Sequence, residues 1–186
     1  MNVVKIPNFI SLKEATILTD WVLANQDEDF FRYADMGGIR KTTRFSTDKH
    51  FDYPKESLEI RKQIISKFNL EENEKKNLYP PFKNGIVASC AYDTDTCYEH
   101  VDPEWHEGLD TLHCNIITQS PDEGGEVIVG GQKHHMVERE LFCYRVSKIE
   151  HEVLKINTKK PRVMWVFGFC ISEEQWKQII DFNKNE

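Results

Sequence analysis

The sequence lacks an excess of positive charge, and this absence bears on its partners. Its 186 residues contain 24 lysine and arginine residues against 31 aspartate and glutamate residues, which gives a formal net charge of -7. A chain with this balance repels phosphate backbones and anionic membrane surfaces. Nucleic acid is therefore a poor first candidate for a partner.

Long hydrophobic runs are also missing. No apolar stretch approaches the length needed to cross a membrane, and the N-terminal residues Met1 to Pro7 lack the charged start and apolar run of a signal peptide. We expect a soluble, cytoplasmic protein with no membrane partner.

Cysteine is scarce and unpatterned, which argues against disulfides and structural zinc. The five residues are odd in number and never occur in a CxxC spacing. They are Cys90, Cys97, Cys114, Cys143 and Cys170. Because most lie in apolar, strand-like segments, we expect reduced residues, mostly in the core.

Helical patterns occupy the two ends of the chain. Ser11 and Glu14 form a capping-box pattern before a helical apolar repeat, and Ser172 with Gln175 does the same near the C-terminus. A further helix is predicted to begin near Pro54, which suits a first helical position. No internal repeat or linker divides the chain, so we expect a single domain over residues 1–186.

From Gly85 the pattern changes to short apolar, β-branched segments separated by turn residues. The predicted strands cover residues 86–92, 111–118, 126–129, 141–146, 149–156 and 162–170. Many short strands favour a sandwich or barrel. We expect an α+β fold with a helical N-terminal part (about 1–84), a jelly-roll core (about 85–171) and a C-terminal helix (about 172–184), the helices packing on one sheet.

A candidate metal site begins at His100-Val101-Asp102. In an extended segment residues two apart face the same way, with Cα atoms about 6 to 7 Å apart, so Tyr98, His100 and Asp102 are predicted to share one face. A His-x-Asp triplet is common by chance. With one more histidine from another strand, however, it supplies the two imidazoles and one carboxylate that bind one face of Fe(II) and leave the other open.

His151 is the favoured third ligand. Alternation in its segment places Ile149, His151 and Val153 on one face of a strand. The competing candidates are His106, His113, His134 and His135.

Arg162 opens a strand eleven residues after His151. Alternation puts Arg162 and Met164 on one face, and Trp165 and Phe167 on the other, which we expect to pack under the helices. A buried guanidinium needs an anionic partner, and a dicarboxylate cosubstrate suits it because arginine binds carboxylate in a bidentate manner.

These residues together resemble the Fe(II)/2-oxoglutarate-dependent oxygenases, especially the prolyl-4-hydroxylase-like branch, over about the C-terminal half of the chain. The resemblance is carried by Tyr92, Tyr98, His100-Val101-Asp102, Glu123-Gly124-Gly125-Glu126, His151-Glu152-Val153 and Arg162. It implies a double-stranded β-helix, the cupin-like form of the jelly roll. It also implies Fe(II) as metal cofactor, with 2-oxoglutarate and O2 as cosubstrates.

Residue by residue, the resemblance makes His100, Asp102 and His151 the iron ligands. It makes Arg162 the anchor for the distal carboxylate of 2-oxoglutarate. Tyr92 takes the position of a tyrosine that lines the pocket, and Asn115 a position beside the cosubstrate.

The spacing departs from the family pattern in two places. The segment between Tyr92 and His100 is about one residue short and lacks the usual glycine, and the step from His151 to Arg162 is one residue long. Lys159 or Lys160 is therefore an alternative carboxylate anchor.

The implied reaction is hydroxylation of an unactivated C–H bond, with release of succinate and CO2. Asp102 favours hydroxylation over halogenation, because related halogenases lack this carboxylate. The implied substrate is a peptidyl residue or a free amino-acid-like molecule, contacted by loops within residues 33–46, 93–97 and 105–110. The alternatives are a catalytically silent jelly-roll module that binds a metal or ligand, and a nucleic-acid demethylase, whose second arginine is replaced here by Gly168.

Overall fold

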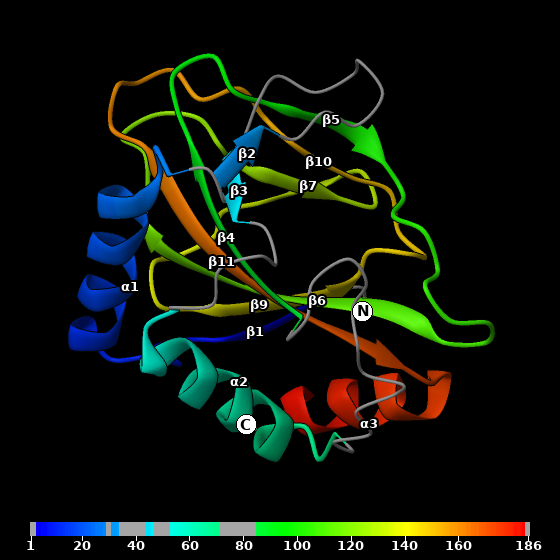
Figure 1. Ribbon diagram of the computed structural model, residues 1–186. Helices are drawn as coiled ribbons and strands as arrows, with labels where there is room; N and C mark the ends of the chain where they lie inside the picture. The colour runs from blue at the N-terminus through cyan, green and yellow to red at the C-terminus, as the bar shows by residue number, and fades with distance from the viewer. Residues whose placement is uncertain (1–2, 29–30, 34–43, 47–52, 71–84, 185–186) are drawn as a thin grey trace.

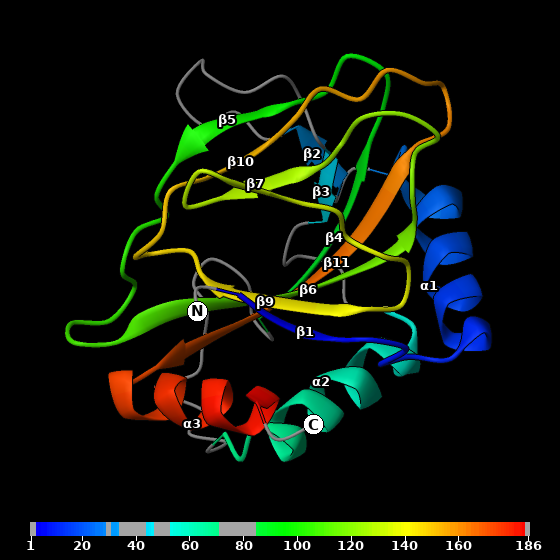
Figure 2. The same ribbon diagram turned by 180° about the vertical axis from the view of Figure 1, so that it is seen from behind.

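Two antiparallel sheets stacked face to face make up most of the molecule, with three helices on the outer face of the larger sheet (Figures 1 and 2). The computed structural model describes residues 3–28, 31–33, 44–46, 53–70 and 85–184. The smaller sheet covers the opposite face of the larger one and leaves a layer of side chains between them. The order of layers is therefore helices, large sheet, small sheet.

The larger sheet has seven strands and the smaller has four, and all paired strands are antiparallel. In spatial order the larger sheet contains β1 (Val4–Ile6), β9 (Leu141–Arg145), β6 (Asp110–Gln119), β11 (Arg162–Ile171), β4 (Ile86–Ala91), β3 (Arg44–Ser46) and β2 (Phe31–Tyr33). The smaller sheet contains β5 (Cys97–His100), β10 (His151–Val153), β7 (Val127–Val129) and β8 (Gln132–His134).

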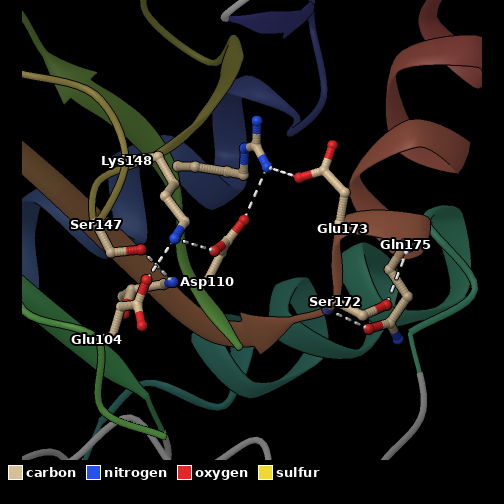
Figure 3. Close-up of polar contacts among 9 residues, drawn as sticks. Glu104, Asp110, Ser147, Lys148, Ser172, Glu173 and Gln175 are labelled. Carbon is tan, nitrogen blue, oxygen red and sulfur yellow. Dashed lines mark hydrogen bonds and ion pairs between the residues drawn. The ribbon is translucent and has the colours of Figure 1, made fainter. Parts of the chain in front are cut away.

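The helices are α1 (Leu12–Asn25), α2 (Lys55–Lys67) and α3 (Glu173–Lys184). The predicted capping box at Ser11 and Glu14 is confirmed by reciprocal hydrogen bonds. The same reciprocal bonds join Ser172 and Gln175 before α3 (Figure 3). Pro54 is the N-cap of α2 rather than its first residue.

The helices pack on one face of the larger sheet, as its alternation predicts. Val163, Trp165 and Phe167 of β11 are fully buried in a cluster that includes residues of all three helices. The ring of Trp165 lies 5.6 Å from that of Trp21 and 5.5 Å from that of Tyr53, measured between centroids. This helix-facing cluster of apolar side chains holds the helices against the sheet.

A second, smaller cluster fills the layer between the two sheets. Its buried members come from β6, β7, β9 and the segments that follow β8 and β9: Ile117, Val127, Val129, Met136, Phe142, Tyr144 and Val146. The partly buried Met164 of β11 and Val153 of β10 pack against it. The same strands therefore present one face to the helices and the other to this inter-sheet layer.

The prediction of antiparallel sheets accompanied by a few helices is confirmed, and two details differ. The N-terminal part is not only helical, because β1 forms one edge of the larger sheet and β3 with β2 the other. The predicted strand at 149–156 is reduced to β10, and its pairing with β5 is irregular between His151 and Val153. No helix in the described ranges is both long and apolar enough to cross a membrane.

Candidate metal centre

His100 and His151 come together because their strands are neighbours. β5 and β10 pair in the smaller sheet with the two histidines directly opposite each other. Their ring centroids lie 4.1 Å apart. Together with Asp102 they form a group whose potential ligand atoms all lie within 4.8 Å of one another.

Asp102 reaches this group from just beyond the end of β5. Its backbone N–H donates to the carbonyl of Val146 at 2.9 Å, and the hydroxyl of Thr111 donates to the carbonyl of the next residue, Pro103, at 3.1 Å. These two hydrogen bonds tie the irregular backbone at Asp102 and Pro103 to β6 and to the segment that follows β9. The carboxylate is held beside His100, with Oδ1 3.2 Å from Nε2 of the imidazole.

Both imidazoles face a backbone carbonyl with Nδ1. In His100 this atom lies 2.7 Å from the carbonyl oxygen of Tyr98, and in His151 it lies 3.1 Å from that of Ile149. An Nδ1–H that donates to a carbonyl leaves Nε2 as the atom with a lone pair for a metal. Two such imidazoles and one carboxylate are the donor set of a facial triad, which suits Fe(II).

The pKa values show how strongly the three side chains interact with one another. Burial disfavours the charged forms of His100 and Asp102, but their mutual hydrogen bond together with the other polar contacts outweighs it. For His100 these contacts are the thiol of Cys97 and the carbonyl of Tyr98, and for Asp102 they are the neighbouring imidazoles. The pKa of His100 is raised to about 10 and that of Asp102 is lowered to about 2. Burial and the charge of His100 lower the pKa of His151 to about 4. At neutral pH His100 is therefore the cationic imidazole of the group, and His151 is neutral.

A bulge in β5 corrects the expectation for Tyr98. Two residues lie between Cys97 and His100, whereas only one lies between their partners Val153 and His151. The extra residue breaks the alternation. Tyr98 consequently has 48% of its surface exposed, and the thiol of Cys97 lies 3.7 Å from Nδ1 of His100. Strand alternation in the sequence could not have predicted that Cys97 lies beside His100, because the bulge carries no sequence signal.

Arg162 is buried at the start of β11 and faces the inter-sheet layer. Its Nη2 atom lies 3.3 Å from the sulfur of Met164 and 3.7 Å from that of Met136, and its buried Nε has no hydrogen-bond partner. No acidic side chain among the described residues pairs with it. Burial lowers its pKa to about 10, so the guanidinium stays charged at neutral pH. A buried cation without a counter-ion fits an anionic ligand such as a dicarboxylate.

The double glycine after Pro121 makes room for this arginine. A Cβ on Gly125 would lie 3.2 Å from Cδ of Arg162, and one on Gly124 would lie 2.1 Å from the carbonyl oxygen of Lys155. Both glycines have positive φ, +83° at Gly124 and +74° at Gly125. The Gly124-Gly125 pair is therefore required by close approach as well as by backbone conformation.

The alternative anchors Lys159 and Lys160 lie elsewhere. Both are exposed between β10 and β11, and Lys160 is within 3.5 Å of Asp122. Of the three candidate carboxylate anchors, Arg162 is the one whose charged group is buried between the sheets.

The remaining two predicted residues have different surroundings. Asn115 is buried on the inter-sheet face of β6, where its amide donates to the carbonyl of Phe142 at 3.2 Å. Tyr92 is half-buried and packs against the helix-facing cluster. Their roles beside the cosubstrate stay predictions.

The competing histidines are dispersed. His135 is exposed, His134 is half-buried on β8, and His106 pairs with Leu109 in a turn-like bridge. His113 lies near the carboxylate of Asp102, outside the group of three. The sequence also gave no reason to single out Tyr144, whose ring packs at 5.3 Å against that of His151.

A network of charged side chains secures the segment that follows Asp102 (Figure 3). The buried carboxylate of Asp110 bonds Arg145 at 2.7 Å and lies 3.3 Å from Nζ of Lys148. Arg145 also bonds Glu173 of α3, and Lys148 bonds Glu104. The network ties the 102–110 segment to β9 and to α3, which restrains the backbone that follows Asp102.

No protein-family model matches the sequence, and no curated protein matches it significantly. Solved structures do match its fold. A prolyl-4-hydroxylase from Pseudomonas putida superposes with a TM-score of 0.68 at 11% identity, covering 92% of this chain and 93% of its own. A Trichoplax adhaerens prolyl hydroxylase, solved with a hypoxia inducible factor peptide fragment, gives 0.70 at 13% identity, covering 94% and 85%.

The fold also occurs in a different kind of enzyme. The non-heme alpha-ketoglutarate-dependent epimerase SnoN from nogalamycin biosynthesis gives a TM-score of 0.68 at 9% identity, covering 91% of this chain and 78% of its own. At these identities the likeness concerns the fold alone. The chemistry has to be argued from the residues of this chain.

Proposed function

We propose that this chain is an Fe(II)- and 2-oxoglutarate-dependent dioxygenase of the prolyl-4-hydroxylase-like branch. The observation that carries the proposal is a pairing of two features in one layer between the sheets. These are the His100, Asp102 and His151 group and the buried, uncompensated Arg162. A metal alone would account for the first feature and an isolated anion for the second, whereas a metal chelated by a dicarboxylate accounts for both.

The alternation of strands between the sheets supports a double-stranded β-helix. Along the chain from β4, the path enters the smaller sheet at β5, returns at β6, and crosses to β7 and β8. It then returns at β9, crosses to β10 and ends in the larger sheet at β11. The ligands sit at the end of β5 and on β10, and Arg162 opens β11, an arrangement consistent with the sequence resemblance.

In this proposal His100, Asp102 and His151 hold the iron, and Arg162 holds the distal carboxylate of 2-oxoglutarate. When bound, iron with 2-oxoglutarate and O2 supplies the oxidant that breaks a C–H bond, with release of succinate and CO2. The protein's part is to orient these groups and to exclude water. Met136, Met164 and Tyr144 line a largely apolar layer around the guanidinium, which strengthens its attraction for a carboxylate.

We propose hydroxylation of a peptidyl residue or of a free amino-acid-like molecule, in the cytoplasm. The Trichoplax prolyl hydroxylase that shares the fold was solved with a peptide, which supports the peptide form of this substrate. The parts of the chain expected to contact it include residues 34–43, which lie outside the described residues.

The test is succinate formation from 2-oxoglutarate by the iron-loaded protein, with a panel of peptides and amino acids and also without substrate. We expect turnover by the natural protein, loss in His100→Ala and Arg162→Ala, and natural turnover in the matched surface variant Lys160→Ala. Metal binding without any turnover across the panel would contradict the proposal and favour the silent metal-binding module.

A further inference from the structure

His113 lies next to the proposed iron site without being one of its ligands. It belongs to the inter-sheet face of β6, since its neighbours Leu112 and Cys114 point into the helix-facing cluster. In the larger sheet it pairs with Gly168 on one side and Tyr144 on the other. Gly168 has no side chain, so the imidazole has no side-chain neighbour at that position of β11.

The two oxygens of the Asp102 carboxylate face two different imidazoles. Oδ1 lies 3.2 Å from Nε2 of His100, and Oδ2 lies 3.9 Å from Nε2 of His113. Both His113 and Asp102 are mostly buried, with 14% and 10% of their side chains exposed. His113 therefore approaches the oxygen that points away from the ligand group.

A carboxylate ligand at this place needs such a partner. The backbone bonds of Asp102 and Pro103 fix the main chain, and the contact of Oδ1 with His100 holds one of the two carboxylate oxygens. A carboxylate that binds a metal through one oxygen leaves the other to be satisfied by a donor, and a buried acceptor without one is costly. A neutral imidazole that carries its hydrogen on Nε2 can supply this donor.

We propose that His113 is a positioning residue for Asp102. Its Nε2 atom faces Oδ2 at 3.9 Å; when a metal draws Oδ1 toward itself, Nε2 would close to hydrogen-bond distance and donate to Oδ2, so that Asp102 occupies one coordination position. The remaining positions then stay open for the cosubstrate and O2. This inference rests on the proposed metal site.

The experiment measures metal binding, not turnover, and uses Co(II) as the probe. His113→Leu removes the donor, His113→Gln keeps an N–H at similar reach, and His113→Asn keeps an amide that is too short to reach Asp102. The matched control is His134→Leu, on β8 at the opposite edge of the smaller sheet from β5. For each protein the dissociation constant is obtained by calorimetry, and the visible spectrum of the Co(II)-loaded protein reports the coordination of the metal.

We expect His113→Leu and His113→Asn to bind Co(II) about 10- to 100-fold more weakly, with altered spectra. His113→Gln is expected to restore affinity to within a few-fold, and the His134→Leu control to match the natural protein. If His113→Leu melts below the working temperature, the comparison of His113→Asn with His113→Gln still decides the point.

Natural affinity and spectrum in His113→Leu or His113→Asn would overturn the inference while leaving the proposed function intact. Equal loss in a folded His113→Gln would also overturn it, because the ring would then act by packing. Absence of Co(II) binding by the natural protein would overturn both.

Discussion

The two faces of the seven-stranded sheet are built by the same strands and have opposite chemistry. On β11, Trp165 and Phe167 enter an apolar cluster beneath the helices, whereas Arg162 and Met164 face the smaller sheet. On β6, Cys114 and Ile116 point to the helices, whereas His113 and Asn115 point the other way. Both faces are well covered, but among the described residues it is the inter-sheet face that holds Arg162, a buried cation with no acidic partner, as well as the buried polar Asn115.

The difference separates residues that stabilise the fold from residues whose burial costs free energy. Apolar burial on the helix side contributes to stability through area removed from water and close packing. A buried guanidinium against two methionine sulfurs opposes stability unless an anion joins it. The inter-sheet layer therefore contains a residue whose burial lowers the stability of the fold and whose charge suits the binding of an anion.

The largest expected effect comes from the helix-facing side. Trp165→Ala removes a fully buried indole from between the sheet and α1. We expect the free energy of unfolding to fall by about 3–5 kcal/mol, because the lost apolar contact leaves a cavity. Urea unfolding followed by circular dichroism measures it. A loss below about 1 kcal/mol would mean that this face is not the stabilising one.

Arg162→Leu lies three residues earlier on the same strand, and we expect it to impair binding without lowering the stability of the fold. We expect an unchanged or higher free energy of unfolding, since an uncompensated buried charge is removed. Binding of 2-oxoglutarate to the metal-loaded protein should weaken by about 2 kcal/mol or more, because a buried charge pair loses one partner. Calorimetry and urea unfolding on one preparation measure both. A variant that is destabilised yet binds 2-oxoglutarate normally would reverse the assignment of the two faces.

The proton held by the ligand group gives a pH dependence. The pKa of His100 is raised to about 10, so its imidazole is protonated at neutral pH, whereas that of His151 is lowered to about 4. A metal must displace the proton from His100. We expect metal affinity to rise with pH between about pH 5 and 9, approaching tenfold or 1.4 kcal/mol per pH unit. Calorimetry in buffers of different ionisation enthalpy should show release of one proton, and a flat profile would contradict the coupling.

The smallest effect is expected at the two exposed lysines. The double variant of Lys159→Ala with Lys160→Ala removes charges that lie outside both layers. Surface ion pairs such as that of Lys160 with Asp122 contribute little, so the free energy of unfolding should change by less than about 1 kcal/mol. Affinity for 2-oxoglutarate should not change. A loss as large as that of Arg162→Leu would show that a lysine is the anchor.

Sequence periodicity predicted the helix-facing side well. Alternation on β11 and the capping residues Ser11 and Ser172 give the correct faces and helix starts, because burial and capping act locally. The pairing of β5 with β10, which sets His100 opposite His151, is long-range and was only inferred from the order of motifs.

Two features of the site lay beyond sequence reasoning. The bulge that turns Cys97 toward His100 depends on the pairing register, which no local pattern encodes. The position of Asp102 depends on its bond to Val146, 44 residues away along the chain. For the same reason His113 appeared only as one more candidate ligand.

The central claim is that the inter-sheet layer binds a metal and a dicarboxylate together. Calorimetric titration of 2-oxoglutarate into the natural protein under argon, with and without Mn(II), tests it most directly. We predict binding that depends on Mn(II), because Arg162 and the metal must share the ligand. Equal binding with and without Mn(II), or no binding in its presence, would contradict the claim.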